Sequence, residues 1–379
     1  MFLKNWKFNQ KLKYGLTLNK YTNLKNTVFY ISSFVITYLI YVYPYDVLGS
    51  LLFEEKIFKL STLIYLFFIY SVLFYFYTKT TTFPIFKFIA FEGLGVGFLS
   101  FFILNLGLIT GFIFNINNFF IGTSCLLLIL IFTILSFINA KSIAIRKITI
   151  NSPKIKKYRK VIFLSDVHLG SNSEKKLETI IGILNEMNFD YLFIGGDLID
   201  SSSFDFKKLS RFKSIKSNIY YISGNHEYSI KNSKEIFENL DQFNIKFLDN
   251  ECVELDGLNL IGISDNLSDQ EKLKIIKSNF SKSLFNITLI HKPNLWRQVQ
   301  KYNDLMLSGH THNGQIFPFN FFVKLKYFQN YGFYEHVNSK LYVSSGVSCW
   351  GPKMRLGSKN EIIEITISNT WKVKIKIII

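Results

Sequence analysis

The sequence predicts an α/β sandwich preceded by an all-α membrane region of four helical spans, and three observations support this prediction. Nearly all of the first 140 residues form long apolar runs separated by short polar links. Beyond them, short apolar runs alternate with segments of helical period, which is typical of a sheet with helices outside it. Histidine or acidic residues follow several of these runs, as in "LSGHTHNGQ", Leu307 to Gln315.

The apolar runs of the first 140 residues are long enough to cross a bilayer, which takes about 20 residues. A soluble helix would show a polar face, and the run "LIYLFFIYSVLFYFY" has none. We therefore predict a basic N-terminus (1–26), a four-helix transmembrane domain (27–140), a basic linker (141–159) and a globular domain (160–379). The predicted spans are Thr27–Tyr45, Ile57–Tyr77, Phe88–Ile109 and Phe119–Asn139.

The net charge of +17 is concentrated around these spans. Residues 1–159 hold 17 Lys/Arg against 4 Asp/Glu, whereas residues 160–379 hold 27 against 23. By the positive-inside rule both ends of the four-span unit face the cytoplasm, so we expect a multi-pass protein of the cytoplasmic (inner) membrane with its globular domain in the cytoplasm. The nearly balanced second half disfavours a nucleic-acid partner. The three isolated cysteines predict no disulfide framework.

Five apolar runs in the second half are interpreted as strands: "KVIFLSD", "DYLFIGGD", "IYYISGN", "NITLIH" and "LMLSGH". Helical periodicity predicts helices over Glu174–Met187 and Ser233–Phe243. Residues Cys252–Ile263 predict a hairpin that turns at Asp256-Gly257, and "EIIEITI" with "WKVKIKIII" predicts a second hairpin near the end of the chain.

Each of these five strands delivers polar residues at its carboxyl end, where α/β sheets place their sites. Any one of them could cap a helix or bind a backbone carbonyl, but five strand ends in sequence favour a common site. Five of the six histidines take part, and His310 and His312, two residues apart, suit two different metal ions. The candidate residues are Asp166, His168, Asp197, Asp200, Asn225, His226, His291, His310 and His312.

This mixture of carboxylate, amide and imidazole groups without a thiolate suits Mn²⁺, Fe or Zn²⁺. Two such ions joined by a carboxylate would generate a hydroxide near neutral pH and stabilise an in-line displacement at phosphorus. The predicted reaction is therefore hydrolysis of a phosphoester or a phosphoanhydride.

The ordered series D-x-H, G-D-x-x-D, G-N-H-E, H and G-H-x-H, within about residues 160–360, resembles the calcineurin-like metallophosphoesterases. The resemblance implies a four-layer αββα sandwich and two divalent ions, of which Mn²⁺ is favoured. It implies that Asp197 bridges the ions, that His226 faces the substrate phosphate, and that Asp200 and Glu227 orient their neighbours. The implied ligands are Asp166, His168, Asp197 and His312 for the first ion, and Asp197, Asn225, His291 and His310 for the second.

The segments "GHTHNGQIFP" and "SSGVSCWGPKMRLGSKNEI" are most similar to the membrane-associated branch of that family, which often has Gly-Gly where this chain has Asn313-Gly314. In the second segment, Arg355 is a candidate for a phosphate or nucleotide contact, or for an ion pair with Glu361. The aromatic stretch Ile316–Tyr334 is either a buried strand-loop pair or a flap or lipid-facing surface. The membrane tether favours the second interpretation, with Lys324 and Lys326 as candidate substrate contacts.

The sequence thus predicts a membrane-anchored metallophosphoesterase whose partners are the bilayer and a phosphorylated, lipid-linked substrate. Resemblance to the calcineurin-like enzymes of lipid A synthesis makes UDP-diacylglucosamine the leading hypothesis for that substrate. One alternative is a soluble phosphodiester, nucleotide or phosphoprotein. The other is a non-catalytic membrane scaffold, which the complete ligand set disfavours. The oligomeric state stays open.

Overall fold

The computed structural model describes residues 27–78 and 83–369, and the chain divides into two compact units, Met1–Ile131 and Phe132–Ile379. The predicted basic N-terminus (1–26) and the stretch "WKVKIKIII" lie outside the described residues. Each unit is built around its own apolar contacts.

The described residues of the first unit form helices whose length and composition suit a bilayer, as predicted, and the last of these helices ends in the second unit. Four candidate spans cover Thr27–Phe53, Leu60–Tyr77, Pro84–Phe114 and Asn118–Lys141. They contain η1 (Tyr38–Val42), α2 (Tyr43–Phe53), α3 (Leu60–Thr78), α4 (Pro84–Phe114) and α5 (Asn118–Lys141). Helix α4 begins with a proline in its first turn and ends where Asn115 turns left-handed, with φ of 50°. Val47, Leu51, Leu104 and Ile121 form a buried contact between α2, α4 and α5.

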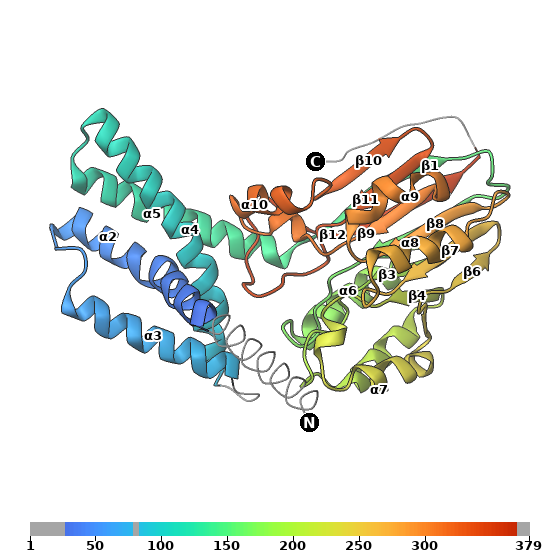
Figure 1. Ribbon diagram of the computed structural model, residues 1–379, viewed down its shortest axis with the longest axis horizontal. Helices are drawn as coiled ribbons and strands as arrows, with labels where there is room; N and C mark the ends of the chain where they lie inside the picture. Colours follow the sequence, from blue (N-terminus) through green and yellow to red (C-terminus); the bar gives the residue numbers. More distant parts are fainter. Residues whose placement is uncertain (1–26, 79–82, 370–379) are drawn as a thin grey trace, which may run out of the picture. The chain divides into compact units, whose positions relative to one another are not determined.

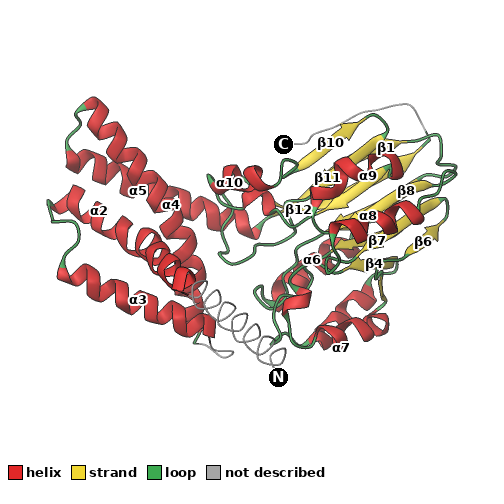
Figure 2. Cartoon of the chain, in the orientation of Figure 1, coloured by secondary structure: helices red, strands yellow, loops and turns green. Residues whose placement is uncertain are grey.

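The second unit contains two six-stranded mixed sheets, shown as arrows in Figure 2. The first sheet has the order β1-β12-β2-β3-β4-β5, and the second has the order β10-β11-β9-β8-β7-β6. The strands of the first sheet are β1 (Ile143–Asn151), β2 (Arg159–Leu164), β3 (Tyr191–Gly195), β4 (Asn218–Ile222), β5 (Ile245–Phe247) and β12 (Asn360–Ser368). Those of the second are β6 (Cys252–Leu255), β7 (Leu258–Ile263), β8 (Phe285–Ile290), β9 (Leu305–Ser308), β10 (Gly332–His336) and β11 (Ser339–Val343).

Three apolar cores hold the sheets and helices in four layers, which confirms the predicted sandwich. In β2, Ile162 and Leu164 pack with α6 (Glu174–Asn185) and α7 (Ser233–Glu238), whereas Val161 and Phe163 pack against the second sheet. The third core lies between the second sheet and the helices α8 (Asp269–Ser278) and α9 (Trp296–Val299). Alternate side chains of a strand point to opposite faces, so β2 is apolar on both faces over Val161–Leu164.

Three predictions about chain segments need correction or refinement. The predicted linker contains β1, which pairs in parallel with β12 because its alternating sequence "IAIRKITIN" suits a strand. The stretch "EIIEITI" lies in β12, between β1 and β2, so it is a central strand and not half of a terminal hairpin. Residues 316–334 form no buried strand-loop pair: Phe319–Lys326 is helix α10, none of whose residues is buried. The hairpin at Asp256-Gly257 is confirmed, because β6 and β7 pair antiparallel.

Candidate metal centre

The predicted site residues gather where the two sheets present the carboxyl ends of parallel strands. In the first sheet β2, β3 and β4 run parallel, and in the second β8 and β9 do so. A hydrogen bond of 2.8 Å between the His291 imidazole Nδ1 and the Gly195 carbonyl joins the end of β8 to the end of β3. Strand ends from both sheets therefore contribute to one site.

The backbone at this edge adopts conformations that non-glycine residues rarely take. Five predicted ligands have left-handed φ values: Asp166 (57°), His168 (52°), Asp197 (51°), His310 (70°) and His312 (49°). Each such residue costs about 1 kcal/mol or more, and strain of this kind concentrates at functional sites. The turn at each strand end aims these side chains toward one another instead of along the sheet.

Two motif glycines are required by the close approach of the chain. A Cβ on Gly224 would lie 2.1 Å from Asp197 Oδ1, and one on Gly309 would lie 2.4 Å from Asp166 Oδ2. Both distances are far below van der Waals contact. These glycines let the loops that carry Asn225 and His310 lie directly against the two carboxylates.

The first group of potential ligands consists of Asp166, His168 and His312. His168 Nε2 lies 3.1 Å from His312 Nε2, and His312 Nε2 lies 3.4 Å from Asp166 Oδ1. Asp166 and His168 are fully buried. Three ligand atoms therefore converge on one point in the protein interior.

The second group consists of Asp197, His291 and His310. His291 Nε2 lies 3.0 Å from Asp197 Oδ2 and 3.2 Å from His310 Nδ1. Asp197 Oδ2 also lies 4.0 Å from His168 Nε2 of the first group. One carboxylate oxygen thus faces both groups, which is the geometry a bridging ligand requires.

The residues present fit two divalent metal ions. The buried Asn225 Oδ1 atom has no hydrogen-bond partner among the described residues, as expected of an oxygen reserved for a ligand. Imidazole nitrogens that approach each other at 3.1 and 3.2 Å need a proton or a cation between them. Oxygen and imidazole donors without thiolates suit the borderline and harder divalent ions.

The charge balance of the site also favours cations. Burial by itself lowers the pKa of His291, but the carboxylates of Asp197, Asp166 and Asp265 together outweigh it and raise the pKa to about 10. Burial lowers the pKa of His310 to about 3, with the neighbouring His291 charge acting in the same direction. Metal ligation requires neutral imidazole, so a cation bound at Asp197 would replace the proton of His291.

Three of the four histidine ligands are oriented by a side chain outside the two groups, and the fourth by the Gly195 carbonyl. Asp200 Oδ2 lies 3.3 Å from His168 Nδ1. The Tyr327 hydroxyl lies 2.9 Å from His310 Nε2, which leaves His310 Nδ1 facing His291. Arg355 donates to the His312 carbonyl at 2.9 Å and reaches the His312 ring at 3.4 Å.

Arg355 occupies neither of its two predicted places. Its side chain is fully buried, and its guanidinium donates to the carbonyls of Ser345 and Ser348 at 2.7 Å. Glu361 instead accepts from Tyr331, Tyr342 and the Ser345 amide. A guanidinium saturated by protein carbonyls is a support for the His312 loop and has no free edge for a phosphate.

Glu227 binds the backbone of two ligand-bearing loops. Its carboxylate accepts hydrogen bonds from the amides of Asp197, Leu198, Ile199 and Gly224. Burial and the nearby Asp197 charge raise the pKa of Glu227 to about 7 despite these bonds. Glu227 thereby fixes the distance between the end of β3 and the end of β4.

His226 lies at the rim of the site, where it forms a third group of potential ligands with His168 and Asp197. Its backbone amide donates to Asp197 Oδ1 at 2.9 Å, and its ring centre lies 5.5 Å from that of the half-exposed Trp350. Its Nε2 lies 3.9 Å from Asp197 Oδ2. This imidazole is therefore close to both candidate ion positions and open to an incoming substrate.

The two lysines predicted as substrate contacts lie on α10 and are exposed. Lys326 Nζ lies 5.4 Å from the ring centre of Tyr327, the residue that binds His310. The structure therefore connects this helix to the metal centre through Tyr327, which the sequence analysis did not single out.

Asp265 was also missed, although a signal for it exists in the sequence. It follows β7 in "GISD", the same strand-Ser-Asp pattern that ends β2 in "FLSD". Its carboxylate forms ion pairs with Lys272 at 3.0 Å and with Lys292, which follows the ligand His291. Asp265 therefore supports the end of β8 from the neighbouring strand.

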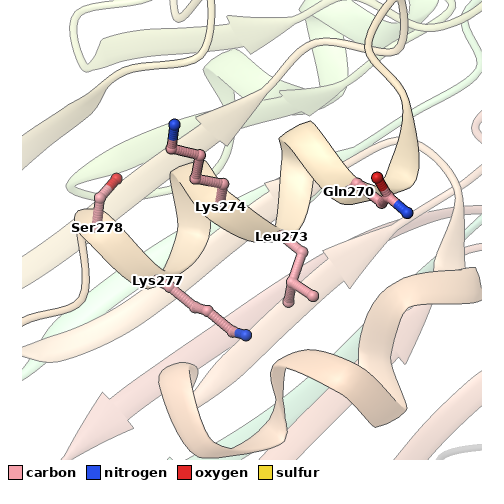
Figure 3. A pocket seen from close by; sticks show the side chains of 5 residues that line it. All are labelled: Gln270, Leu273, Lys274, Lys277 and Ser278. Atoms are coloured by element: carbon pink, nitrogen blue, oxygen red, sulfur yellow. The ribbon is translucent and has the colours of Figure 1, made fainter.

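A surface hollow along α8, shown in Figure 3, is separate from the metal-binding groups. Its lining residues are Gln270, Leu273, Lys274, Lys277 and Ser278, all from that one helix. None of the candidate ligands lines it. A ligand there would be held from one side only, so we assign the chemistry to the strand-end site.

Comparisons with known proteins identify chains similar to this one. Residues 159–314 match the family model described as calcineurin-like phosphoesterase. An uncharacterised metallophosphoesterase of Campylobacter jejuni is 35% identical over 259 residues, which cover 64% of this chain and 68% of the relative. One from Helicobacter pylori is 38% identical over 58% of this chain, but the match spans only 62% of the relative's own length.

Two further similarities come from more distant proteins. A zebrafish (Danio rerio) protein named "Transmembrane protein with metallophosphoesterase domain" is 31% identical over 55% of this chain and 53% of its own length. The solved structure of TT1561 from Thermus thermophilus aligns with a TM-score of 0.36 and 12% identity, covering 49% of this chain and 89% of its own. The match to the Campylobacter protein and the family model show that the chain belongs to the calcineurin-like metallophosphoesterases.

Proposed function

We propose that this calcineurin-like metallophosphoesterase hydrolyses a phosphodiester or pyrophosphate bond of a lipid-linked substrate at a membrane surface. The observation that carries the proposal is the shared Asp197 carboxylate, whose Oδ2 faces a ligand group on each side. The complete set of ligand side chains in the two groups opposes the alternative of a non-catalytic scaffold. Mn²⁺ is the first ion to test, followed by Fe and Zn²⁺.

Different residues of the chain would bind the metal ions, position the ligands and donate a proton. Two divalent ions, when bound, lower the pKa of a water molecule and neutralise charge on phosphate oxygens. Asp197 would hold the two ions at a fixed separation, and Asp200, Tyr327 and Glu227 would keep the ligands in place. These residues supply a preorganised site that need not rearrange during the reaction.

His226 would act on the leaving oxygen. Burial lowers the pKa of its imidazole, and the Asp197 carboxylate opposes this effect. An anionic phosphate beside the ring would favour its protonated form. The protonated imidazole could then donate its proton to the departing alkoxide or phosphate oxygen, which is general acid catalysis.

The membrane setting supports a lipid-linked substrate. Four helices are long and apolar enough to cross a bilayer, and a transmembrane relative also carries a metallophosphoesterase domain. The basic residues that flank the spans favour a metal centre on the cytoplasmic side of the inner membrane. A reporter fusion of alkaline phosphatase after Lys160 tests this orientation, because the reporter is active only outside the cytoplasm. An active fusion would overturn it.

UDP-diacylglucosamine is the specific substrate to test first. The full chain in detergent with Mn²⁺ should release UMP and diacylglucosamine phosphate, detected by mass, and Asp197→Asn should release neither. Failure to cleave this lipid, together with Mn²⁺-dependent cleavage of bis(p-nitrophenyl) phosphate, would reject the substrate and keep the reaction class. Absence of metal-dependent turnover on both would reject the proposed function.

A further inference from the structure

The segment Phe317–Phe328, here called the aromatic segment, exposes an unusual amount of apolar surface. Among the described residues after Lys141, twelve large hydrophobic side chains are exposed, and half of them lie in these twelve positions. They are Phe317, Phe319, Phe321, Phe322, Leu325 and Phe328, with Leu325 87% exposed. Apolar patches of this kind mark binding surfaces more often than free surface.

The aromatic segment lies close to the point where the fourth candidate span ends. The Phe317 amide donates to the Leu356 carbonyl at 2.9 Å, and the Leu356 amide donates to the Gln315 carbonyl at 3.1 Å. The adjacent Arg355 amide donates to the carbonyl of Ser136, in the last turns of α5, at 2.9 Å. These turns belong to the same compact unit as the metal centre. Leu356, which binds the start of the aromatic segment, is therefore the direct neighbour of Arg355, which binds the end of the span.

A second contact strengthens this connection. The Asn139 side chain donates to the Arg355 carbonyl at 3.2 Å, and Asn360 donates to the Ala140 carbonyl at 2.7 Å. Three residues in the last turns of α5, Ser136, Asn139 and Ala140, are thus held by the Arg355–Asn360 stretch. If α5 crosses the bilayer, its last turns lie at the headgroup level, and this packing brings the aromatic segment to that level too.

The aromatic segment also borders the metal centre. Tyr327, directly after α10, contacts His310 through its hydroxyl. Gln315, at the other end, binds the Trp350 backbone, and the Trp350 ring lies next to the His226 ring. A molecule resting on the aromatic segment would consequently lie beside the residues that we assign to catalysis.

We propose that the aromatic segment inserts into the headgroup region of the bilayer that α5 crosses, so that the metal centre opens toward membrane lipids. The exposed Lys324 and Lys326 on α10 and Lys353 beside Trp350 favour anionic headgroups. The aromatic side chains of this short helix suit the acyl-chain side of the headgroup region, and its lysines suit the negatively charged headgroups. The occupant of this surface is the lipid layer and not a protein partner.

This insertion has a consequence for substrate access that rests on the proposed function. A lipid-linked phosphoester could reach the ions while its acyl chains stay in the bilayer. Such access would explain why the phosphoesterase domain is joined to a span without a flexible linker, since β1 follows α5 almost directly.

Spin-label accessibility in vesicles tests the insertion without measuring turnover. The full chain would carry Cys252→Ser, which removes the exposed cysteine and leaves Cys125 and Cys349 buried. A label would be attached at Leu325→Cys, and a matched label at Lys234→Cys on α7, whose side chain is 90% exposed. The vesicles would contain phosphatidylethanolamine and phosphatidylglycerol, and collision with oxygen would be compared with collision with a water-soluble nickel chelate.

The label at position 325 should show a ratio of oxygen to nickel accessibility severalfold higher than the label at position 234. An equal ratio at the two positions would show that the aromatic segment lies in water and would overturn the proposal. Low accessibility to both reagents at position 325 would also overturn it, because the segment would then be covered by protein, such as a second copy of the chain. Neither result depends on whether the chain hydrolyses a lipid.

A kinetic comparison tests the consequence for substrate access. Leu325→Glu should lower turnover of the vesicle-embedded lipid about tenfold more than turnover of bis(p-nitrophenyl) phosphate, and Lys234→Glu should change both alike. Equal effects of Leu325→Glu on the two substrates would contradict access through the bilayer. If the wild-type chain cleaves neither substrate, the proposed function fails while the insertion measured by spin labels can still hold.

Discussion

The two halves of the metal centre have similar ligand geometry but different supports. The first half comprises Asp166, His168 and His312, and the second half comprises Asn225, His291 and His310, with Asp197 between them. Imidazole nitrogens approach each other at 3.1 Å in the first half and at 3.2 Å in the second. The difference lies in the groups behind the imidazoles.

Charged side chains orient the first half, and neutral groups orient the second. Asp200 and the buried Arg355 contact the rings of the first half. The Gly195 carbonyl and the Tyr327 hydroxyl contact those of the second. A carboxylate raises the basicity of its imidazole partner more than a neutral group does, whereas burial and the charges of His168 and Arg355 lower the pKa of His312. We therefore expect the first half to depend most on the contact between Asp200 and His168, and the second half to respond to the position of α10.

Asp197→Asn should have the largest effect, because it removes the group on which both halves depend. An amide can supply one neutral oxygen but cannot neutralise charge on either side, so both ions should be lost. Turnover of bis(p-nitrophenyl) phosphate should fall about 10⁴-fold or more, the scale of several kcal/mol that metal ions contribute. Metal content by mass spectrometry and turnover should be measured together, with the exposed Asp205→Asn as control. Retention of both ions at full stoichiometry would contradict the bridging role.

His226→Gln should leave both halves loaded and still remove most of the activity. His226 lies outside both halves, and loss of a general acid costs about 10²- to 10⁴-fold. The loss of turnover should be smaller for a substrate with a p-nitrophenyl leaving group, which departs without a proton, than for one with an alkyl leaving group. Equal deficits for the two leaving groups, or loss of metal, would argue that His226 serves as a ligand.

Asp200→Asn should separate the two halves. Loss of the carboxylate behind His168 should weaken metal affinity of the first half roughly 10- to 100-fold, and affinity of the second half should change little. Titration of the metal-free chain with Mn²⁺, followed by electron paramagnetic resonance, can resolve the two affinities. Equal weakening of both would mean that the halves are supported as one unit and that the comparison fails.

Asp265→Asn tests the ion pairs of Asp265 with Lys272 and Lys292, which lie near the second half. Burial by itself raises the pKa of Asp265, but the hydrogen bond from Lys292 and the neighbouring charges of His291 and Lys272 lower it overall. A carboxyl whose folded-state pKa is depressed stabilises the fold fully above its unfolded pKa near 3.8 and loses that stabilisation as the pH falls through the folded-state value.

At neutral pH, Asp265→Asn should therefore lower the free energy of unfolding by about 3 kcal/mol, because it leaves a buried lysine without its partner. The difference from the wild type should shrink as the pH falls below about 4. Thermal unfolding of the full chain in detergent, followed by near-ultraviolet circular dichroism, measures both effects. A difference that stays constant down to about pH 2.5, well below the unfolded pKa near 3.8, would show that Asp265 acts through packing and not through its charge.

That the strand-end side chains lie at one edge could be predicted from the sequence because each motif is local. An apolar run followed by Asp, Asn or His specifies both the strand and the edge at which it ends, as at Asp166 and His291. Likewise, the four apolar runs could be recognised as helices because their length and composition leave little choice in a bilayer. These patterns need no knowledge of distant contacts.

The features that escaped prediction depend on distant parts of the chain. The insertion of β12 between β1 and β2 joins residues about 200 positions apart, which no local pattern encodes. The position of Arg355 depends on carbonyls from two loops, and an exposed arginine would have the same local sequence. Tyr327 was missed for a similar reason: one tyrosine among several aromatic residues reaches His310 only because α10 forms.

Tyr327→Phe should have the smallest effect of the five, and it tests the link between the second half and the surface of the protein. The substitution removes one neutral hydrogen bond to His310 and keeps the ring, so Mn²⁺ affinity of the second half should fall tenfold or less, about 1 kcal/mol. Tyr302→Phe, whose ring lies near Lys277 and not at the site, is the matched control. If α10 sets the position of Tyr327, transfer from detergent into anionic vesicles should change the second-half affinity of the wild type but not of Tyr327→Phe. A lipid response that persists in Tyr327→Phe would show that the membrane acts on the second half by another route, and the surface coupling inferred from this hydroxyl would be wrong.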